Sequence, residues 1–154
     1  MARLIIAIDG PAAAGKSTVA KALAQRYHLT YLDSGALYRA MAWKVLQKGM
    51  DVTDEPQVVL FCNSLNVRIK NGGEGPSEVW VDSENVTPFL RQQDVTRSAS
   101  FLSTYSGVRQ KLLSLQREIA TEGVVAEGRD MGTVVFPAAD LKFYLDADIS
   151  VRGR

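Results

Sequence analysis

The sequence predicts an α/β protein built on a parallel sheet, and three observations carry this prediction. Residues 3–8 form a short, almost wholly apolar run rich in β-branched side chains, which is typical of a strand buried on both faces. Residues 16–27 place apolar side chains at helical spacing. A glycine-rich turn over residues 10–15 joins the two segments. A doubly buried strand that leads directly into a helix favours parallel over antiparallel pairing.

The remaining elements follow from the same patterns. A helix is predicted over residues 35–47, with Ser34 as the cap and with Leu37, Met41 and Val45 or Leu46 on its inward face. Further helices are predicted over residues 56–65 after Asp54, over 92–104 and over 107–121. Short apolar runs at residues 29–32, 123–126 and 141–145 predict further strands, the last two as central strands. Between the helices, residues 66–70 and 78–82 predict two paired strands around a glycine-rich turn at 71–75. We therefore expect a β-containing insert within the α/β domain.

Composition narrows the classes of function. The 154 residues fit one domain, and 46% hydrophobic content indicates a packed core. A net charge of +1 predicts no broad basic face for nucleic acid. The single cysteine, Cys62, allows no internal disulfide and fits a reducing compartment. With no signal-peptide pattern and no long apolar stretch, we expect a cytoplasmic protein without membrane contact.

Residues 10–17, Gly-Pro-Ala-Ala-Ala-Gly-Lys-Ser, match G-x-x-x-x-G-K-[ST] at every specified position. In such a loop the backbone N–H groups and the helix N-terminus bind phosphate, the lysine reaches the β- and γ-phosphates, and the serine hydroxyl ligates Mg²⁺. The alternative is a Gly/Ala-rich turn with an exposed lysine, but the strand and helix on either side favour the phosphate loop. The predicted ATP-binding residues are Gly10, Pro11, Ala12, Ala13, Ala14, Gly15, Lys16, Ser17 and Thr18, with Lys16 catalytic and Ser17 the metal ligand.

Basic side chains suggest what receives the phosphate. Arg39 lies on the predicted helix at 35–47, Arg109 on the predicted helix at 107–121, and Arg129 with Asp130 just after the predicted strand at 123–126. Because ligands of open α/β sheets lie at the carboxyl ends of the strands, residues that follow predicted strands, such as Gly15, Ser34 and Arg129, are expected to converge. Arg129 lies in a glycine-flanked stretch after a buried strand, which favours ligand binding. A solvated surface charge is the plain alternative for any arginine, and we assign it to Arg3, Arg26, Arg68 and Arg117.

Three stretches resemble bacterial cytidylate kinases. They are IDGPAAAGKST at residues 8–18, LDSGALYR at 32–39 and EGRDMGTVVFP at 127–137, the third being especially characteristic. The resemblance covers essentially the whole chain, and residues 67–86 match the β-rich insert of this family. It implies a P-loop fold of the nucleoside monophosphate kinase type, with a parallel sheet flanked by helices. It also implies a single domain over residues 1–154, with a core at 1–33 and 101–154 and a monophosphate-binding lobe at about 34–100.

The resemblance implies transfer of the γ-phosphoryl of ATP to CMP or dCMP, with Mg²⁺. Carried over to this sequence, it assigns Ser34, Arg39 and Arg129 to the phosphate of CMP, and Ser100, Arg109 and Asp130 to the cytosine ring. Lys16, Arg39 and Arg129 are the implied catalytic residues. The base assignment agrees with cytosine chemistry, because a carboxylate can accept from the N4 amino group while an arginine donates to the ring. No general base is needed for an acceptor that is already ionised, so positioning and charge neutralisation carry the reaction. Asp9 or Asp33 is a candidate for ordering metal-bound water.

The chain departs from the family at its end. It stops at Arg154, where a cytidylate kinase would continue into a helix, a mobile lid with further arginines, a last core strand and a closing helix. We therefore expect a truncated piece whose strand at 141–145 has an uncovered edge. A nucleotide-binding module without catalysis is the alternative function, and a kinase for another small acceptor is a third possibility. A protein that binds CMP better than AMP or UMP would favour the cytidylate kinase over a kinase for another acceptor. We expect a monomer that binds ATP and CMP or dCMP.

Overall fold

The structure is a computed structural model that describes residues 3–11, 14–71 and 77–146. It divides into two compact units, one formed by Met1–Ser34 and Gln116–Arg154 and the other by Gly35–Leu115. The predicted loop residues Ala12 and Ala13, most of the turn at 71–75 and the chain end at 151–154 lie outside the described residues. Within the described ranges, no helix is both long and apolar enough to cross a membrane.

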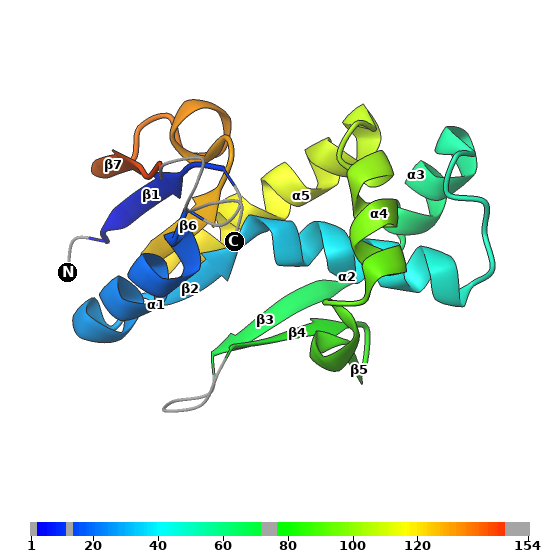
Figure 1. Ribbon diagram of the computed structural model, residues 1–154, viewed down its shortest axis with the longest axis horizontal. Helices are drawn as coiled ribbons and strands as arrows, with labels where there is room; N and C mark the ends of the chain where they lie inside the picture. The colour runs from blue at the N-terminus through cyan, green and yellow to red at the C-terminus, as the bar shows by residue number, and fades with distance from the viewer. Residues whose placement is uncertain (1–2, 12–13, 72–76, 147–154) are drawn as a thin grey trace. The chain divides into compact units, whose positions relative to one another are not determined.

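The first unit contains a four-stranded parallel sheet (Figure 1). Its strands are β1 (Ile5–Asp9), β2 (Thr30–Asp33), β6 (Val124–Gly128) and β7 (Leu141–Tyr144), in the order β2-β6-β1-β7. Asp9 pairs with Gly128, and Asp33 pairs with Glu127. The carboxyl ends of the three strands β2, β6 and β1 therefore meet at one edge of the sheet, as the sequence predicts.

Helix α1 (Lys16–Tyr27) packs on this sheet and has the predicted bounds. Its buried Ala20 and Ala24 join a core cluster with Ile6, Ile8 and Val125. Small side chains on the helix allow it to lie close to the β-branched strands. The helix ends at Tyr27, because the next residue, His28, has a φ of 55° and this left-handed conformation does not continue an α-helix. The prediction of a buried β1 is confirmed, with the strand displaced towards Asp9 relative to residues 3–8.

The two strands predicted as central differ. β6 is central, and its first four residues are buried. β7 is an outer strand of the described sheet, and its burial pattern is exposed at all four positions, including Leu141 and Phe143. The prediction of a central strand at 141–145 was wrong for the described sheet, because apolar composition alone does not distinguish an edge from a centre. The uncovered edge expected for this strand is confirmed within the described sheet.

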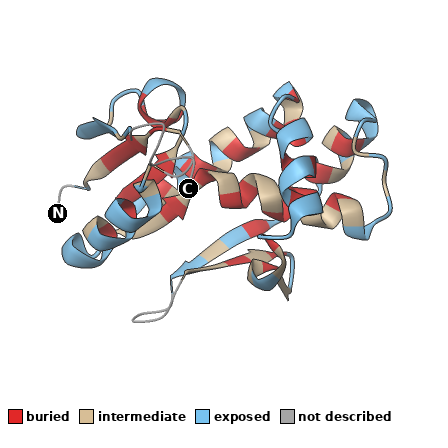
Figure 2. Ribbon diagram, viewed as in Figure 1, coloured by how far each residue is buried: buried red, intermediate tan, exposed pale blue. Residues whose placement is uncertain are grey.

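The second unit is mainly helical. Its helices are α2 (Ser34–Gln47), which starts in the first unit, α3 (Glu55–Asn63), α4 (Gln93–Leu102) and α5 (Ser106–Ile119), whose last residues from Gln116 onward belong to the first unit. A short turn, η1 (Thr87–Phe89), lies between β5 and α4 in the chain. The predicted inward face of α2 is confirmed, because Leu37, Met41 and Val45 are fully buried (Figure 2). Gly107 at the start of α5 lies so close to α3 that a Cβ there would meet Val59 at 2.4 Å.

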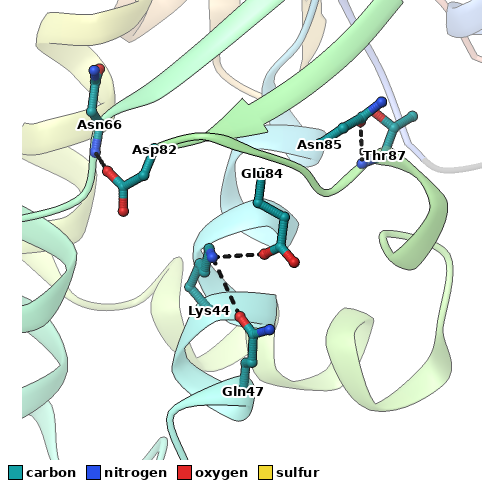
Figure 3. A network of polar contacts seen from close by, with 7 residues as sticks. All are labelled: Lys44, Gln47, Asn66, Asp82, Glu84, Asn85 and Thr87. Atoms are coloured by element: carbon teal, nitrogen blue, oxygen red, sulfur yellow. Dashed lines mark hydrogen bonds and ion pairs between the residues drawn. The ribbon is translucent and has the colours of Figure 1, made fainter.

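An antiparallel sheet completes the second unit. It pairs β3 (Val67–Asn71) with β4 (Ser77–Val81) and β4 with β5 (Glu84–Asn85), which confirms the predicted strand pair and adds a short third strand. Helix α2 contacts this region through two side chains. The ring of Trp43 stacks on the ring of Phe89, with 4.4 Å between the ring centroids. The Lys44 ammonium lies 2.7 Å from the Glu84 carboxylate (Figure 3).

Candidate nucleotide-binding site

Two glycines shape the loop between β1 and α1. Gly10 has a φ of 150° and Gly15 a φ of 88°, and L side chains rarely adopt either conformation. A Cβ at Gly10 would also lie only 2.0 Å from the Leu145 carbonyl oxygen. The glycines of the motif are therefore required by backbone geometry, which turns the chain from the strand end into the N-terminus of α1.

Lys16 and Ser17 are both held by neighbours in the loop region. The Lys16 ammonium donates to the carbonyl oxygens of Gly10 at 2.7 Å and Pro11 at 2.9 Å. The Ser17 hydroxyl donates to Glu127 Oε1 at 3.0 Å. The cation thus lies over its own loop, and the hydroxyl points to the end of the neighbouring strand β6.

Glu127 is a functional candidate that the sequence analysis missed. It is 5% exposed near the end of β6 and accepts hydrogen bonds from Ser17 and, at 2.5 Å, from the Tyr31 hydroxyl on β2. Burial raises the pKa of the Glu127 carboxyl, and burial together with the bond to Glu127 raises the pKa of Tyr31. A single carboxylate closing an otherwise apolar strand was the available sequence signal.

The pair Ser17 and Glu127 has the chemistry of a magnesium site. In residues 3–11, 14–71 and 77–146 no group of three or more His, Cys, Asp or Glu side chains could hold a metal by itself. Mg²⁺ usually takes one or two protein oxygens and completes its shell with phosphates and water. A hydroxyl and a carboxylate 3.0 Å apart beside the loop fit that requirement.

Asp9 holds the segment that carries Arg129 and Asp130. Its carboxylate accepts from the backbone N–H of Met131 at 2.7 Å and of Gly132 at 2.8 Å. These amides begin a five-residue π-helical turn, η3 (Met131–Val135), which the sequence did not predict. Both carboxylate oxygens of Asp9 therefore contact backbone, whereas the carboxylate beside Ser17 belongs to Glu127.

The first unit also brings Ser34 to this edge of the sheet. Ser34 is buried as the first residue of α2, where the sequence had placed a cap. It lies close to Gly128, because a Cβ added to Gly128 would be 3.2 Å from the Cβ of Ser34. Gly128 immediately precedes Arg129, which is exposed. The phosphate loop, Ser34 and the Arg129 segment thus gather at the carboxyl ends of three parallel strands, as expected for an open α/β sheet.

The other predicted CMP residues belong to the second unit. Arg39 is half-buried on α2, while Ser100 on α4 and Arg109 on α5 are exposed. The Ser100 hydroxyl donates to the Thr96 carbonyl oxygen at 3.3 Å. Their roles in binding CMP stay predictions.

Two of the arginines assigned to solvated surface charge are exposed, as expected, and they also bond to backbone carbonyls. Arg117 donates from Nε to the Val135 carbonyl and from Nη2 to the Val134 carbonyl, both at 3.1 Å. Arg68 donates to the Asp82 carbonyl at 3.1 Å. The sequence did not predict these bonds, because spacing does not show which backbone carbonyls a fold leaves within reach.

The fold and the loop define a class. A glycine loop with Lys16 and Ser17 after the first strand, a parallel sheet and a carboxylate closing the adjacent strand are the features of a P-loop protein that binds nucleotide phosphates.

Comparison with known proteins gives the family. The family model for cytidylate kinase matches residues 6–154, and the chain belongs to this family. It is 44% identical to a bifunctional pantoate ligase/cytidylate kinase from a Synechococcus strain over 99% of the chain, which is 29% of that protein. It is also 44% identical to a cytidylate kinase of Pelotomaculum thermopropionicum, over 97% of the chain and 66% of that protein. It is 42% identical to a cytidylate kinase of Geobacillus thermodenitrificans, over 99% of the chain and 68% of that protein. The chain thus spans less than a third of the bifunctional relative and about two thirds of the two cytidylate kinases.

Proposed function

We propose that the protein transfers the γ-phosphoryl group of ATP to CMP or dCMP and releases ADP and CDP or dCDP. The observation that carries the proposal is that Lys16 and Ser17, after the loop that follows β1, lie beside Glu127 near the end of β6. The Arg129–Asp130 segment follows β6 directly in the chain. Membership of the cytidylate kinase family supports both the donor and the acceptor.

The loop would hold the triphosphate of ATP. In such a loop the backbone N–H groups and the N-terminus of the following helix bind an anion. The Lys16 ammonium would exchange the carbonyls of Gly10 and Pro11 for β- and γ-phosphate oxygens. That exchange replaces two neutral acceptors with charged ones, which strengthens the hydrogen bonds. Lys16 would thereby neutralise charge that develops during transfer.

Ser17 and Glu127 would hold Mg²⁺ together with the phosphates of ATP. Bound there, the ion supplies neutralisation of charge on the β- and γ-phosphates. Tyr31 donates to the second oxygen of Glu127, so the carboxylate keeps one oxygen directed at Ser17. The part-buried Tyr31–Glu127 bond would orient this carboxylate towards the ion.

For the acceptor, we propose that Ser34, Arg39 and Arg129 bind the phosphate of CMP and that Ser100, Arg109 and Asp130 read the base. Cytosine offers an N4 amino donor to the Asp130 carboxylate and acceptor atoms to the Arg109 guanidinium. Uracil would present a carbonyl to Asp130, and the resulting unpaired polar groups penalise UMP. We further propose that the protein acts as a monomer in the cytoplasm with these nucleotides as its ligands.

A coupled ADP-release assay with ATP and Mg²⁺ tests the proposal by comparing CMP, dCMP, AMP and UMP as acceptors. We expect turnover with CMP and dCMP, and values of kcat/KM for AMP and UMP lower by about two orders of magnitude. The Asp130→Asn variant should reduce the preference for CMP over UMP while leaving the KM for ATP unchanged. Equal turnover with AMP would indicate another acceptor. CMP binding without any turnover would indicate the nucleotide-binding module.

A further inference from the structure

The turn η3 is held at both of its ends by charged side chains from other elements. At its N-terminus, the Asp9 carboxylate of β1 accepts from the Met131 and Gly132 amides at 2.7 and 2.8 Å. At its C-terminus, the Arg117 guanidinium of α5 donates to the Val134 and Val135 carbonyls at 3.1 Å each. An anion at free N–H groups and a cation at free carbonyls is the favourable arrangement for a helical turn.

The turn is also closed onto the backbone of Asp130. The Asp130 carbonyl accepts from the Val134 and Val135 amides at 2.9 and 3.2 Å. Met131 is fully buried, and it lies against Gly128, where a Cβ would meet its side chain at 2.9 Å. The two residues between Gly128 and Met131 are therefore anchored on both sides, although Arg129 itself is exposed.

We propose that Asp9 and Arg117 are positioning residues that clamp η3 and thereby fix Arg129 and Asp130 for the nucleotide acceptor. The inference rests on the proposed function, because it takes Arg129 and Asp130 as the residues that meet CMP. Neither Asp9 nor Arg117 needs to touch nucleotide in this role. A long exposed arginine loses conformational freedom when it binds an anion, and a fixed backbone reduces that cost.

Arg117→Met tests the clamp, because methionine keeps an unbranched apolar side chain and removes both donors. Calorimetry on the 154-residue chain should show CMP binding weakened by about tenfold and ATP binding changed less than about twofold. Arg117→Lys keeps the charge and one donor site, so it should recover part of the loss. Arg26→Met is the matched control, since Arg26 is exposed on the last turn of α1 and lies over the Tyr27 ring; it should leave both affinities unchanged.

A double-mutant cycle distinguishes positioning from a general structural role. If Arg117 acts through Arg129 and Asp130, Arg117→Met should weaken CMP binding less in an Arg129→Met background than in the wild type, because only the contribution through Asp130 remains. In the single variant without nucleotide, the Met131 and Gly132 amides should exchange with solvent faster than in the wild type.

The outcomes separate the two proposals. A wild-type protein that binds no CMP overturns the proposed function, and the clamp's role with it. A wild type that binds CMP and an Arg117→Met variant that binds it equally well overturn the clamp alone. Equal losses for CMP and ATP, or an undiminished effect in the Arg129→Met background, also reject the clamp in favour of a merely structural arginine.

Discussion

The two units of the chain use their polar side chains differently. In the first unit, polar groups near the sheet edge bond to one another or to backbone: Ser17 and Tyr31 to Glu127, and Asp9 to two amides. In the second unit, the side chains of α2 that define the inward face are apolar, and the candidate ligand residues Ser100 and Arg109 are exposed. The contrast indicates that the candidate phosphate-binding groups of the first unit are oriented by one another and by backbone, while the inward face of α2 in the second unit is packed as an apolar core.

The largest effect should come from the loop of the first unit. Lys16→Met removes the ammonium that bonds to Gly10 and Pro11. We expect kcat to fall by about three orders of magnitude, because the charge on the transferring phosphoryl group loses its main counter-charge. The free energy of unfolding should change by less than about 1 kcal/mol. Arg26→Met on the same helix is the control, and a variant with near-normal kcat would contradict the loop assignment.

A substitution in the core of the second unit should lower stability, whereas the loop substitution in the first unit should lower kcat. Met41 on α2 is fully buried, so Met41→Ala should lower the free energy of unfolding by about 2–5 kcal/mol through lost burial and a cavity. Leu60→Ala on α3 is the control, because Leu60 is 68% exposed and should change stability by less than about 0.5 kcal/mol. Denaturant unfolding measures both. Similar values for the two variants would mean that the α2 face is not a packed core.

Cys62 reports on the same packing. It is buried on α3, and burial raises the pKa of its thiol to about 11, well above its usual range. Because only the thiolate reacts, the raised pKa alone should lower alkylation of the folded protein at pH 7 by about a hundredfold. Alkylation should increase as the pH rises towards that pKa, and denaturant should abolish the protection. Mass spectrometry after iodoacetamide treatment measures this, and rapid labelling at pH 7 would show that α3 opens readily.

The smallest effect should come from the tie between α2 and β5. The bond from Lys44 lowers the pKa of Glu84, and the pair is partly exposed. A lowered carboxyl pKa stabilises the folded state above the unfolded pKa and loses that contribution as the pH falls through the folded value. Glu84→Gln should therefore cost less than about 1 kcal/mol at neutral pH, and the cost should shrink in acid or high salt. Urea unfolding at several pH values measures it; a cost that grows in acid would contradict the assigned sign.

Local pattern was enough to predict much of the molecule. The bounds of α1, the buried β1, the inward face of α2 and the antiparallel strand pair were all visible in apolar periodicity and turn residues. The phosphate loop was visible because its glycines are required by backbone geometry, as the positive φ values of Gly10 and Gly15 show. These features depend on neighbours in sequence, so the sequence alone could predict them.

Other features depend on partners far along the chain. Glu127 meets Ser17 across 110 residues, Asp9 meets the Met131 amide across 122, and Arg117 reaches carbonyls of η3. The outer position of β7 likewise depends on which strands pair, not on its composition. Residue types and spacing determined that this chain would form a P-loop and a parallel sheet. Only the tertiary structure decided which carboxylate lies beside Ser17 and which side chains hold the Arg129 segment, because hydrogen bonds between distant residues follow from the packing of strands and helices.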